Sequence, residues 1–304
     1  MAAPQADCDM TDLDLPDHEY LTVPELAELL RLKERKIYDL AASGEVPCSR
    51  ATGKLLFPAN EIREWIARAK SGGEPAPVHR PQILLGSHDP LLDWAIRQSQ
   101  SGLASYVDGS MDGLERFLQG EGIAAGLHLR DEKSGQWNVP IVARMATRQN
   151  AVLIHFASRK RGLVYRDPDL DLASLNEISN LRFAPRQPGS GTDQLFRDLA
   201  AEARLDLKKV DLVDVARSED EAVESVRRGL ADVTFGLEAV AKSYGLKFTP
   251  LIDEEFALLV DRKAWFEPAF QCFLTFCQTD ALAQRAAGMG GYNVSALGRV
   301  RWNA

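Results

Sequence analysis

Residues 20–66 read YLTVPELAELLRLKERKIYDLAASGEVPCSRATGKLLFPANEIREWI. Thr22 and Glu25 have the spacing of a capping box, and the leucines that follow recur at helical intervals, which predicts a helix over residues 24–30. After a short turn, inward-facing apolar positions predict a second helix over residues 33–43. The block therefore begins with two short helices joined by a tight turn.

The rest of this block completes a small domain. Gly44 ends the second helix as a C-cap. Residues 46–57 predict a β-hairpin, with Thr52-Gly53 at its tip. Pro58 is expected to open a last helix. Its apolar positions repeat at i, i+3 and i+4: Ile62, Trp65 and Ile66.

The charge of the 304-residue chain is unevenly distributed. In total 36 Lys and Arg oppose 44 Asp and Glu, a balance that by itself argues against a nucleic-acid partner. Residues 1–19, however, hold six acids and no Lys or Arg, whereas residues 20–70 hold nine bases and seven acids. The net charge therefore hides a mildly basic block behind an acidic tail, which we expect to be disordered.

Residues 71–81 (SGGEPAPVHRP) have the composition of a linker. Beyond it, residues 82–304 alternate short apolar runs with helical patterns, which predicts an α/β domain with parallel strands. The expected strands are 83–85, 104–107, 123–127, 152–156, 212–215, 233–235 and 257–260. The expected helices are 90–100, 111–119, 192–203, 219–228 and 237–244.

Residues 20–70 resemble the excisionase/MerR-like winged helix-turn-helix family over nearly the whole family pattern. The resemblance implies that double-stranded DNA is a partner. We expect base or phosphate contacts from the start of the second helix and backbone contacts from the wing. The candidate DNA-binding residues are Lys33, Arg35, Lys36, Tyr38, Arg50 and Lys54.

A second resemblance rests on GSHDPLLD (86–93), GSMDGLERFLQGEGIAAGLHL (109–129), WNVP (137–140), RQPGSGT (186–192), RRGLADVTFGLEAVA (227–241) and GGYNVSALGRV (290–300). These segments resemble the periplasmic-binding-protein-like domain of some bacterial regulators, related to type 2 solute-binding proteins such as the molybdate binder. The resemblance implies two α/β lobes that close on a small ligand, with molybdate or tungstate as the effector. Lobe I would cover about 82–155 and 256–304, and lobe II about 156–255, with crossings near 155–159 and 251–256.

Small polar residues lie at four junctions before expected helices, the kind of place where α/β proteins bind ligands. They lie at 86–89, 109–110, 189–192 and 236–238. Glycine allows the backbone to approach a ligand closely, and a helix N-terminus beside a hydroxyl group favours binding of an anion. Asp193 weakens that field, so a neutral or zwitterionic metabolite is an alternative. The candidate ligand-binding residues are Ser87, His88, Ser110, His128, Arg186, Ser190, Gly191 and Thr192.

Other classes of protein find little support. Metalloprotease, nucleophile-elbow, phosphate-loop and dinucleotide motifs are absent, so we expect no enzyme, no catalytic residue, no cofactor and no metal site. Cys272 and Cys277 are expected to be buried on a helix. The N-terminus lacks a secretory signal, and no apolar run is long enough for a membrane helix, which indicates a cytoplasmic protein.

The sequence therefore predicts a one-component, ligand-responsive transcriptional regulator that acts as a homodimer on DNA. One alternative keeps this architecture but senses another small anion or polar metabolite. The other is an excisionase-like architectural DNA binder with no effector.

Overall fold

The computed structural model describes residues 19–50, 53–69 and 79–304. The chain divides into two units, Met1–Val78 and His79–Ala304. Residues 1–18 of the predicted tail, and most of the predicted linker, lie outside the described residues. Within the described ranges, no helix is both long and apolar enough to cross a membrane.

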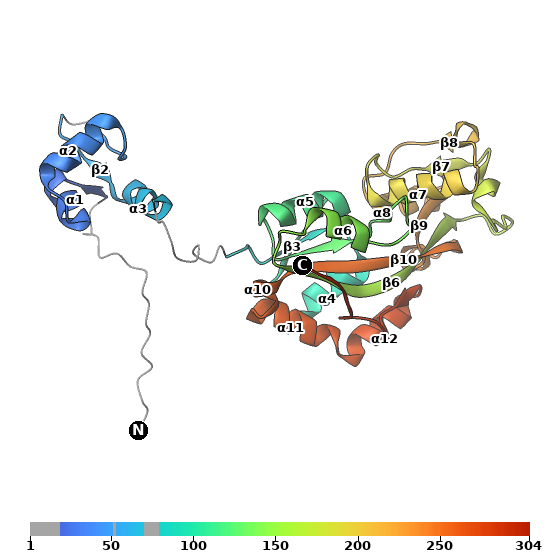
Figure 1. Ribbon diagram of the computed structural model, residues 1–304. Coiled ribbons are helices and arrows are strands. Elements are labelled where there is room, and N and C mark those ends of the chain that lie inside the picture. The colour runs from blue at the N-terminus through green and yellow to red at the C-terminus, as the bar shows by residue number, and fades with distance from the viewer. Residues whose placement is uncertain (1–18, 51–52, 70–78) are drawn as a thin grey trace, which may run out of the picture. The chain divides into compact units, whose positions relative to one another are not determined.

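The first unit is a small helical domain with a two-stranded sheet (Figure 1). Its elements are β1 (Tyr20–Leu21), α1 (Val23–Leu30), α2 (Glu34–Ser43), β2 (Phe57–Pro58) and α3 (Ala59–Arg68). The predicted capping box is present, since the backbone N–H of Thr22 donates to the Glu25 carboxylate at 2.7 Å. Leu26, Ile37 and Ile62 are fully buried and join the three helices in one core.

Two predictions for this unit need correction. The hairpin expected over 46–57 is reduced to one antiparallel bridge between Ser49 and Leu56. Phe57 pairs instead with Leu21, and Pro58 lies opposite Tyr20. The start of the domain is thereby joined to the segment just before α3. Because Pro58 belongs to this short sheet, the last helix begins one residue later than expected, at Ala59.

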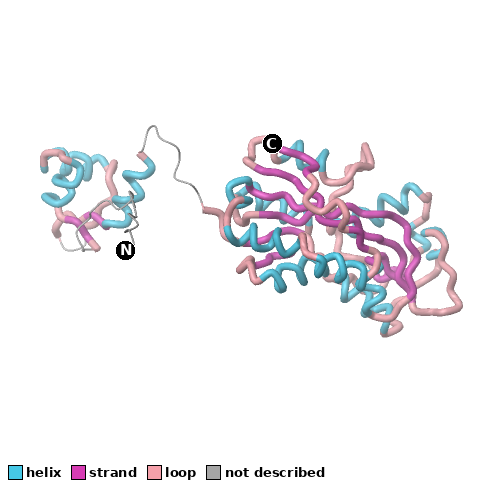
Figure 2. The backbone as a smooth tube through the Cα atoms, turned by 90° about the horizontal axis from the view of Figure 1, so that it is seen from below, coloured by secondary structure: helices cyan, strands magenta, loops and turns pink. Residues whose placement is uncertain are grey.

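The second unit contains one ten-stranded sheet with helices on both faces (Figures 1 and 2). Its first half contains β3 (Ile83–Gly86), α4 (Pro90–Ser99), β4 (Ala104–Val107), α5 (Ser110–Gln119), β5 (Ala124–Leu127), α6 (Val139–Met145) and β6 (Ala151–Tyr165). Then follow β7 (Arg182–Ala184), α7 (Gly191–Glu202), β8 (Asp211–Leu212), α8 (Glu219–Arg227), β9 (Val233–Leu237), α9 (Glu238–Ser243) and β10 (Lys247–Asp261). The last elements are α10 (Arg262–Trp265), α11 (Pro268–Cys277), α12 (Asp280–Met289), β11 (Tyr292–Asn293) and β12 (Val300–Asn303).

Two long strands connect the halves of this unit. The main strand order is β4-β3-β5-β10-β6-β9-β7-β8, with β11 and β12 also on β6. β6 and β10 have 15 residues each and pair antiparallel along nearly their whole length, from Lys247 opposite Tyr165 to Asp261 opposite Ala151. At about 3.3 Å per residue each strand runs for about 50 Å. The crossings expected from the sequence lie within these two strands.

Alternating side chains fill a core on each face of the sheet. Leu84 packs on the side of α4 and α11, whereas its neighbour Leu85 packs on the side of α5. Figure 1 shows the same arrangement, with α5 and α6 over one face and α4, α11 and α12 over the other. The inner strands β3, β5 and β9 are largely buried on both faces, which is why they could be recognised as continuous apolar runs, whereas the edge strand β4 is exposed.

Other differences from the predicted elements are local. The strand expected over 212–215 is a two-residue strand at Asp211–Leu212, and β7 was not anticipated. Cys277 is buried as predicted, but Cys272 is exposed. At 3.6 residues per turn, five residues place two side chains about 140° apart, so one buried face of α11 cannot hold both.

Candidate functional site

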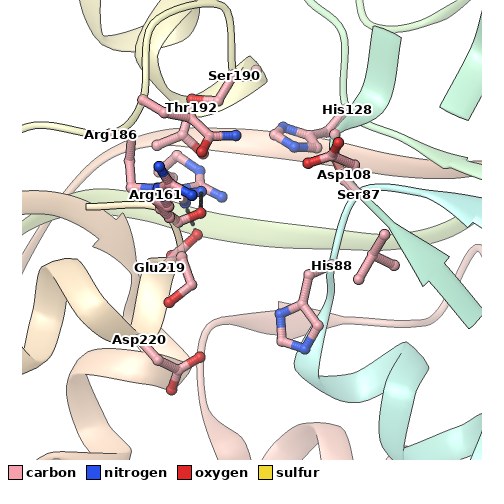
Figure 3. A pocket seen from close by; sticks show the side chains of 16 residues that line it. Ser87, His88, Asp108, His128, Arg161, Arg186, Ser190, Thr192, Glu219 and Asp220 are labelled. Atoms are coloured by element: carbon pink, nitrogen blue, oxygen red, sulfur yellow. Dashed lines mark hydrogen bonds and ion pairs between the residues drawn. The ribbon is translucent and has the colours of Figure 1, made fainter. Parts of the chain in front are cut away.

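A pocket of about 300 Å³ lies in the second unit, where several strands end and helices begin. Figure 3 shows its walls. One wall consists of Ser87 and His88 before α4, Asp108 and Gly109 before α5, and His128 after β5. The opposite wall consists of Arg186, Ser190, Gly191 and Thr192 around the start of α7, and Arg217, Ser218, Glu219 and Asp220 at the start of α8. Arg161 on β6 also lines the pocket.

The start of α7 provides hydrogen-bond donors. Ser190 is the N-cap, and its hydroxyl oxygen accepts from the Asp193 backbone N–H at 3.1 Å. The N–H groups of Gly191 and Thr192 belong to the first turn, where no carbonyl within the helix can accept them. Thr192 is buried, and its hydroxyl forms no hydrogen bond with any residue that the structure describes. This helix end therefore has donors and partial positive charge available for an anion.

The Asp193 carboxylate, which the sequence suggested would weaken that field, is paired within α7. It accepts from Arg197 at 2.9 Å, one turn further along α7, and the residue does not line the pocket. The start of α8 differs, because Glu219 and Asp220 bring carboxylates to the pocket itself. The anion-favouring side is therefore the start of α7.

Arg186 adds a cation to the same side. It is partly buried, and its guanidinium donates to the backbone carbonyls of Ala216 at 3.3 Å and Arg217 at 3.0 Å. No carboxylate among the described residues pairs with it. Burial lowers the pKa of Arg186, and the nearby Glu219 partly offsets this effect. A ligand anion could therefore form the direct ion pair that no described carboxylate makes with Arg186.

Ser110 lies one layer behind the pocket and not in its wall, which corrects the prediction. It is fully buried, and its hydroxyl is 2.8 Å from that of Ser87. Its oxygen also accepts from the His128 backbone N–H at 3.0 Å. Ser110 therefore positions two residues that do line the pocket. The predicted junction at 236–238 does not line the pocket either, and Glu238 lies against Gly290 and Gly291.

A buried ionic network forms the floor of the site. Glu254, on β10, has no exposed surface and accepts from Arg159 at 2.5 Å, from the Nε of Arg161, and contacts Nδ1 of His128. Arg159 also donates to Asp89 at 2.8 Å, and Arg161 donates to Glu219 at 3.1 Å. The network thus joins residues before α4 to the start of α8 through β6 and β10.

The arginines decide the charge state of Glu254. Burial alone would raise its pKa, but Arg159 and Arg161, together with His128, hold the pKa well below its usual range. For His128 burial is the larger effect and lowers the pKa, although Glu254 opposes it. The carboxylate is therefore ionised and the imidazole neutral near pH 7.

The structure thus brings seven of the eight predicted ligand-binding residues into one pocket: Ser87, His88, His128, Arg186, Ser190, Gly191 and Thr192. Their role in binding stays a prediction. Sequence reasoning missed Arg161, Glu219 and Asp108. The available signal for Arg161 was the alternation with Arg159, which places both side chains on one face of a strand.

In the first unit, the candidate DNA-binding residues are all exposed. At about 100° per residue, Arg35 and Asp39 point away from the buried face of α2, whereas Lys36 and Tyr38 lie on its two sides. Tyr38, Arg50 and Lys54 line a groove with the start of α1. Arg50 also donates to the Ala41 carbonyl at 3.5 Å, so it connects the wing region to α2.

Known proteins resemble both units. The PBP superfamily domain matches residues 94–278, more than half of the chain, and the helix-turn-helix domain matches residues 20–70. The protein YvgK of Bacillus subtilis (strain 168) is 24% identical over 301 residues, which cover 92% of this chain and 96% of YvgK.

Solved structures match the chain more distantly. An OxyR C206 mutant from Corynebacterium glutamicum has a TM-score of 0.47 at 12% identity and covers 88% of this chain and 90% of its own. The regulatory domain of CcmR from Synechocystis PCC6803, in complex with 2-PG, has a TM-score of 0.46 at 12% identity. It covers 64% of this chain and 93% of its own. From the family matches, the chain belongs to the PBP superfamily and carries a helix-turn-helix DNA-binding domain at its N-terminus.

Proposed function

We propose that this protein is a ligand-responsive transcriptional regulator in which the PBP domain binds a small anion and the helix-turn-helix domain binds DNA. One observation carries the proposal. A single pocket combines the free N–H groups at the start of α7, the buried Thr192 hydroxyl, and Arg186, a cation with no carboxylate partner among the described residues. Both domains are of binding types, and the proposal includes no catalytic step.

Molybdate or tungstate is the effector that the family resemblance implies, and it is the first candidate. A second candidate, another small anion or polar metabolite, is favoured by the carboxylates in the lining. Glu219 accepts from the cation Arg161 and from the Leu237 N–H, but Asp108 and Asp220 also line the pocket. A doubly charged oxyanion would be repelled by them, whereas a ligand with a donor group would not.

Binding can be transmitted because both lobes contribute to the pocket. Arg130 donates to Glu202 at 2.7 Å, and Gln194 donates to Glu132 at 3.1 Å, so contacts already join the two walls. A ligand that touches both walls stabilises this closed arrangement over an open one. It changes DNA affinity only to the extent that DNA also prefers one of the two states.

We further propose that the protein acts as a homodimer in the cytoplasm. The block over residues 20–70 has only two more bases than acids. One such helix-turn-helix domain attracts DNA weakly, so strong operator binding requires two of these domains on two half-sites.

Calorimetry on the full-length protein with molybdate, tungstate, sulfate and formate tests the effector. Heat with molybdate and tungstate but not with sulfate would support the first candidate. A matching change in operator affinity by fluorescence anisotropy would support regulation. If no small anion or organic acid binds, while the protein still binds DNA, the function as an effector sensor is wrong and the architectural alternative is favoured.

A further inference from the structure

His128 occupies a special place in the pocket. It follows β5, is only 5% exposed, and lines the cavity beside Thr192 (Figure 3). Its ring packs directly against the start of α7. A Cβ added at Gly191 would lie 2.9 Å from Cε1 and 3.2 Å from Nε2 of this ring. The edge of the ring that carries Nε2 therefore faces the junction between the two walls.

The other ring nitrogen, Nδ1, is buried and faces the protein interior. Nδ1 of His128 contacts Oε1 of Glu254, which also accepts from Arg159. A carboxylate held between two arginines stays ionised and can only accept, so the proton in this contact belongs to Nδ1. The backbone N–H of His128 is separately fixed by Ser110 at 3.0 Å. These contacts leave the ring little freedom to turn.

This tautomer makes Nε2 a hydrogen-bond acceptor. In a neutral imidazole one nitrogen donates and the other accepts, and burial keeps the ring neutral by lowering its pKa. In the described part of the chain Nε2 has no hydrogen-bond partner. Because His128 lines the pocket, this acceptor is open to a ligand, and a ligand that donates to it gains a hydrogen bond in a partly desolvated site. An anion that has only acceptors would instead face the lone pair of the ring.

We propose that His128 makes the site selective for an anion that also carries an O–H or N–H donor, such as a 2-hydroxy or 2-amino carboxylate. The anionic group would lie against the start of α7 and Arg186, and the donor against Nε2. Asp108 and Asp220, also in the lining, suit the same donor-bearing class. This inference rests on the proposed small-anion function and narrows it away from oxyanions without a donor, such as molybdate.

Calorimetry with matched ligand pairs tests the proposal: lactate and alanine against propionate, and malate against succinate, with molybdate and sulfate alongside. We expect the donor-bearing member of at least one pair to bind about tenfold tighter, the ratio expected from about one well-formed hydrogen bond. His128→Leu should reduce that ratio to near one. His155→Leu is the matched control, because His155 is a buried histidine on β6 that does not line the pocket. It should keep the ratio.

Equal affinities within every pair would overturn the inference while leaving a small-anion function standing. Failure of all these ligands to bind would count against the small-anion function itself. A second measurement is independent of ligand identity and of the stability of His128→Leu. ¹⁵N NMR of the histidine rings in the full-length protein should show Nδ1 protonated and Nε2 unprotonated for His128, and the opposite tautomer would overturn the proposal.

Discussion

The DNA-facing helix and the ligand pocket use charge in opposite ways. Lys33, Arg35 and Lys36 at the start of α2 are exposed and have no ion pair among the described residues. In the pocket, Arg161 and Glu254 are buried and each is paired. An exposed charge stays hydrated and costs little free energy, and several such charges add up in attracting a polyanion. A buried charge is stable only when all of its charged partners are present. Removing a charged side chain should therefore weaken DNA binding at the start of α2 and destabilise the fold in the pocket.

The largest effect is expected from Glu254→Gln. The change leaves Arg159 and Arg161 without their shared carboxylate and should lower the free energy of unfolding by about 3–5 kcal/mol. Urea denaturation provides the measurement. Asp253→Asn is the control on the next residue of β10, where the pair with Lys160 is 3.1 Å long but exposed. It should cost less than about 1 kcal/mol. A similar loss of stability in both variants would contradict the proposed difference between buried and exposed charges.

The double change Arg35→Ala and Lys36→Ala should abolish operator binding in a gel shift and leave folding intact. Two lost phosphate contacts should also flatten the slope of log affinity against log salt concentration, by about 0.9 for each contact. Arg63→Ala, which removes one exposed arginine of α3, is the control for loss of a positive charge outside α2. If the double variant binds with wild-type affinity at moderate salt, α2 is not the DNA-reading helix.

Gly191→Ala tests the close contact between the two pocket walls. The new Cβ would meet the His128 ring at 2.9 Å, so we expect a loss of stability of about 1–3 kcal/mol and weaker ligand binding. Gly288→Ala, in α12, adds a methyl group with nothing within 4 Å. In a helix that change should be neutral or stabilising. Thermal melting compares the two, and an unaffected Gly191→Ala protein would contradict the packing.

The smallest effect should come from pH. The pKa of His128 in the folded protein lies below its ordinary value of 6.5, because burial disfavours the charged ring. The unfolded chain then binds more protons below pH 6.5, so the free energy of unfolding should fall as the pH drops through that value. His155 contributes in the same direction. Urea titrations at several pH values should show a shallower fall in His128→Leu, and an equal slope would exclude His128 as a cause.

Much of the fold could be predicted because its local patterns are clear. The capping box at Thr22 and Glu25 gave the start of α1, and Gly44 gave the end of α2. The apolar runs gave the positions of β3, β4 and β5. The long strands β6 and β10 could not be predicted in full, because charged residues occupy their middles. There, Arg159 and Lys160 oppose Glu254 and Asp253 across the sheet, a pairing that no single segment reveals.

The candidate site could likewise be predicted only in part. Glycine, serine and threonine after strands mark the pocket in the sequence, because helix N-termini need caps and ligands need close backbone approach. Those local requirements placed Ser87, Ser190 and Thr192 correctly in the lining. Ser110 met the same local requirement, but packing against His128 placed it one layer behind the wall.

The sequence by itself determined the two domains, most of the helices and the general place of the pocket, since each depends on residues close together in the chain. Only the tertiary structure decided that Glu254, 126 positions after His128, fixes the proton of that ring. It also decided that Arg186 forms no direct ion pair with a carboxylate among the described residues. Burial and distance between remote segments set those properties, and neither has a signature in local sequence.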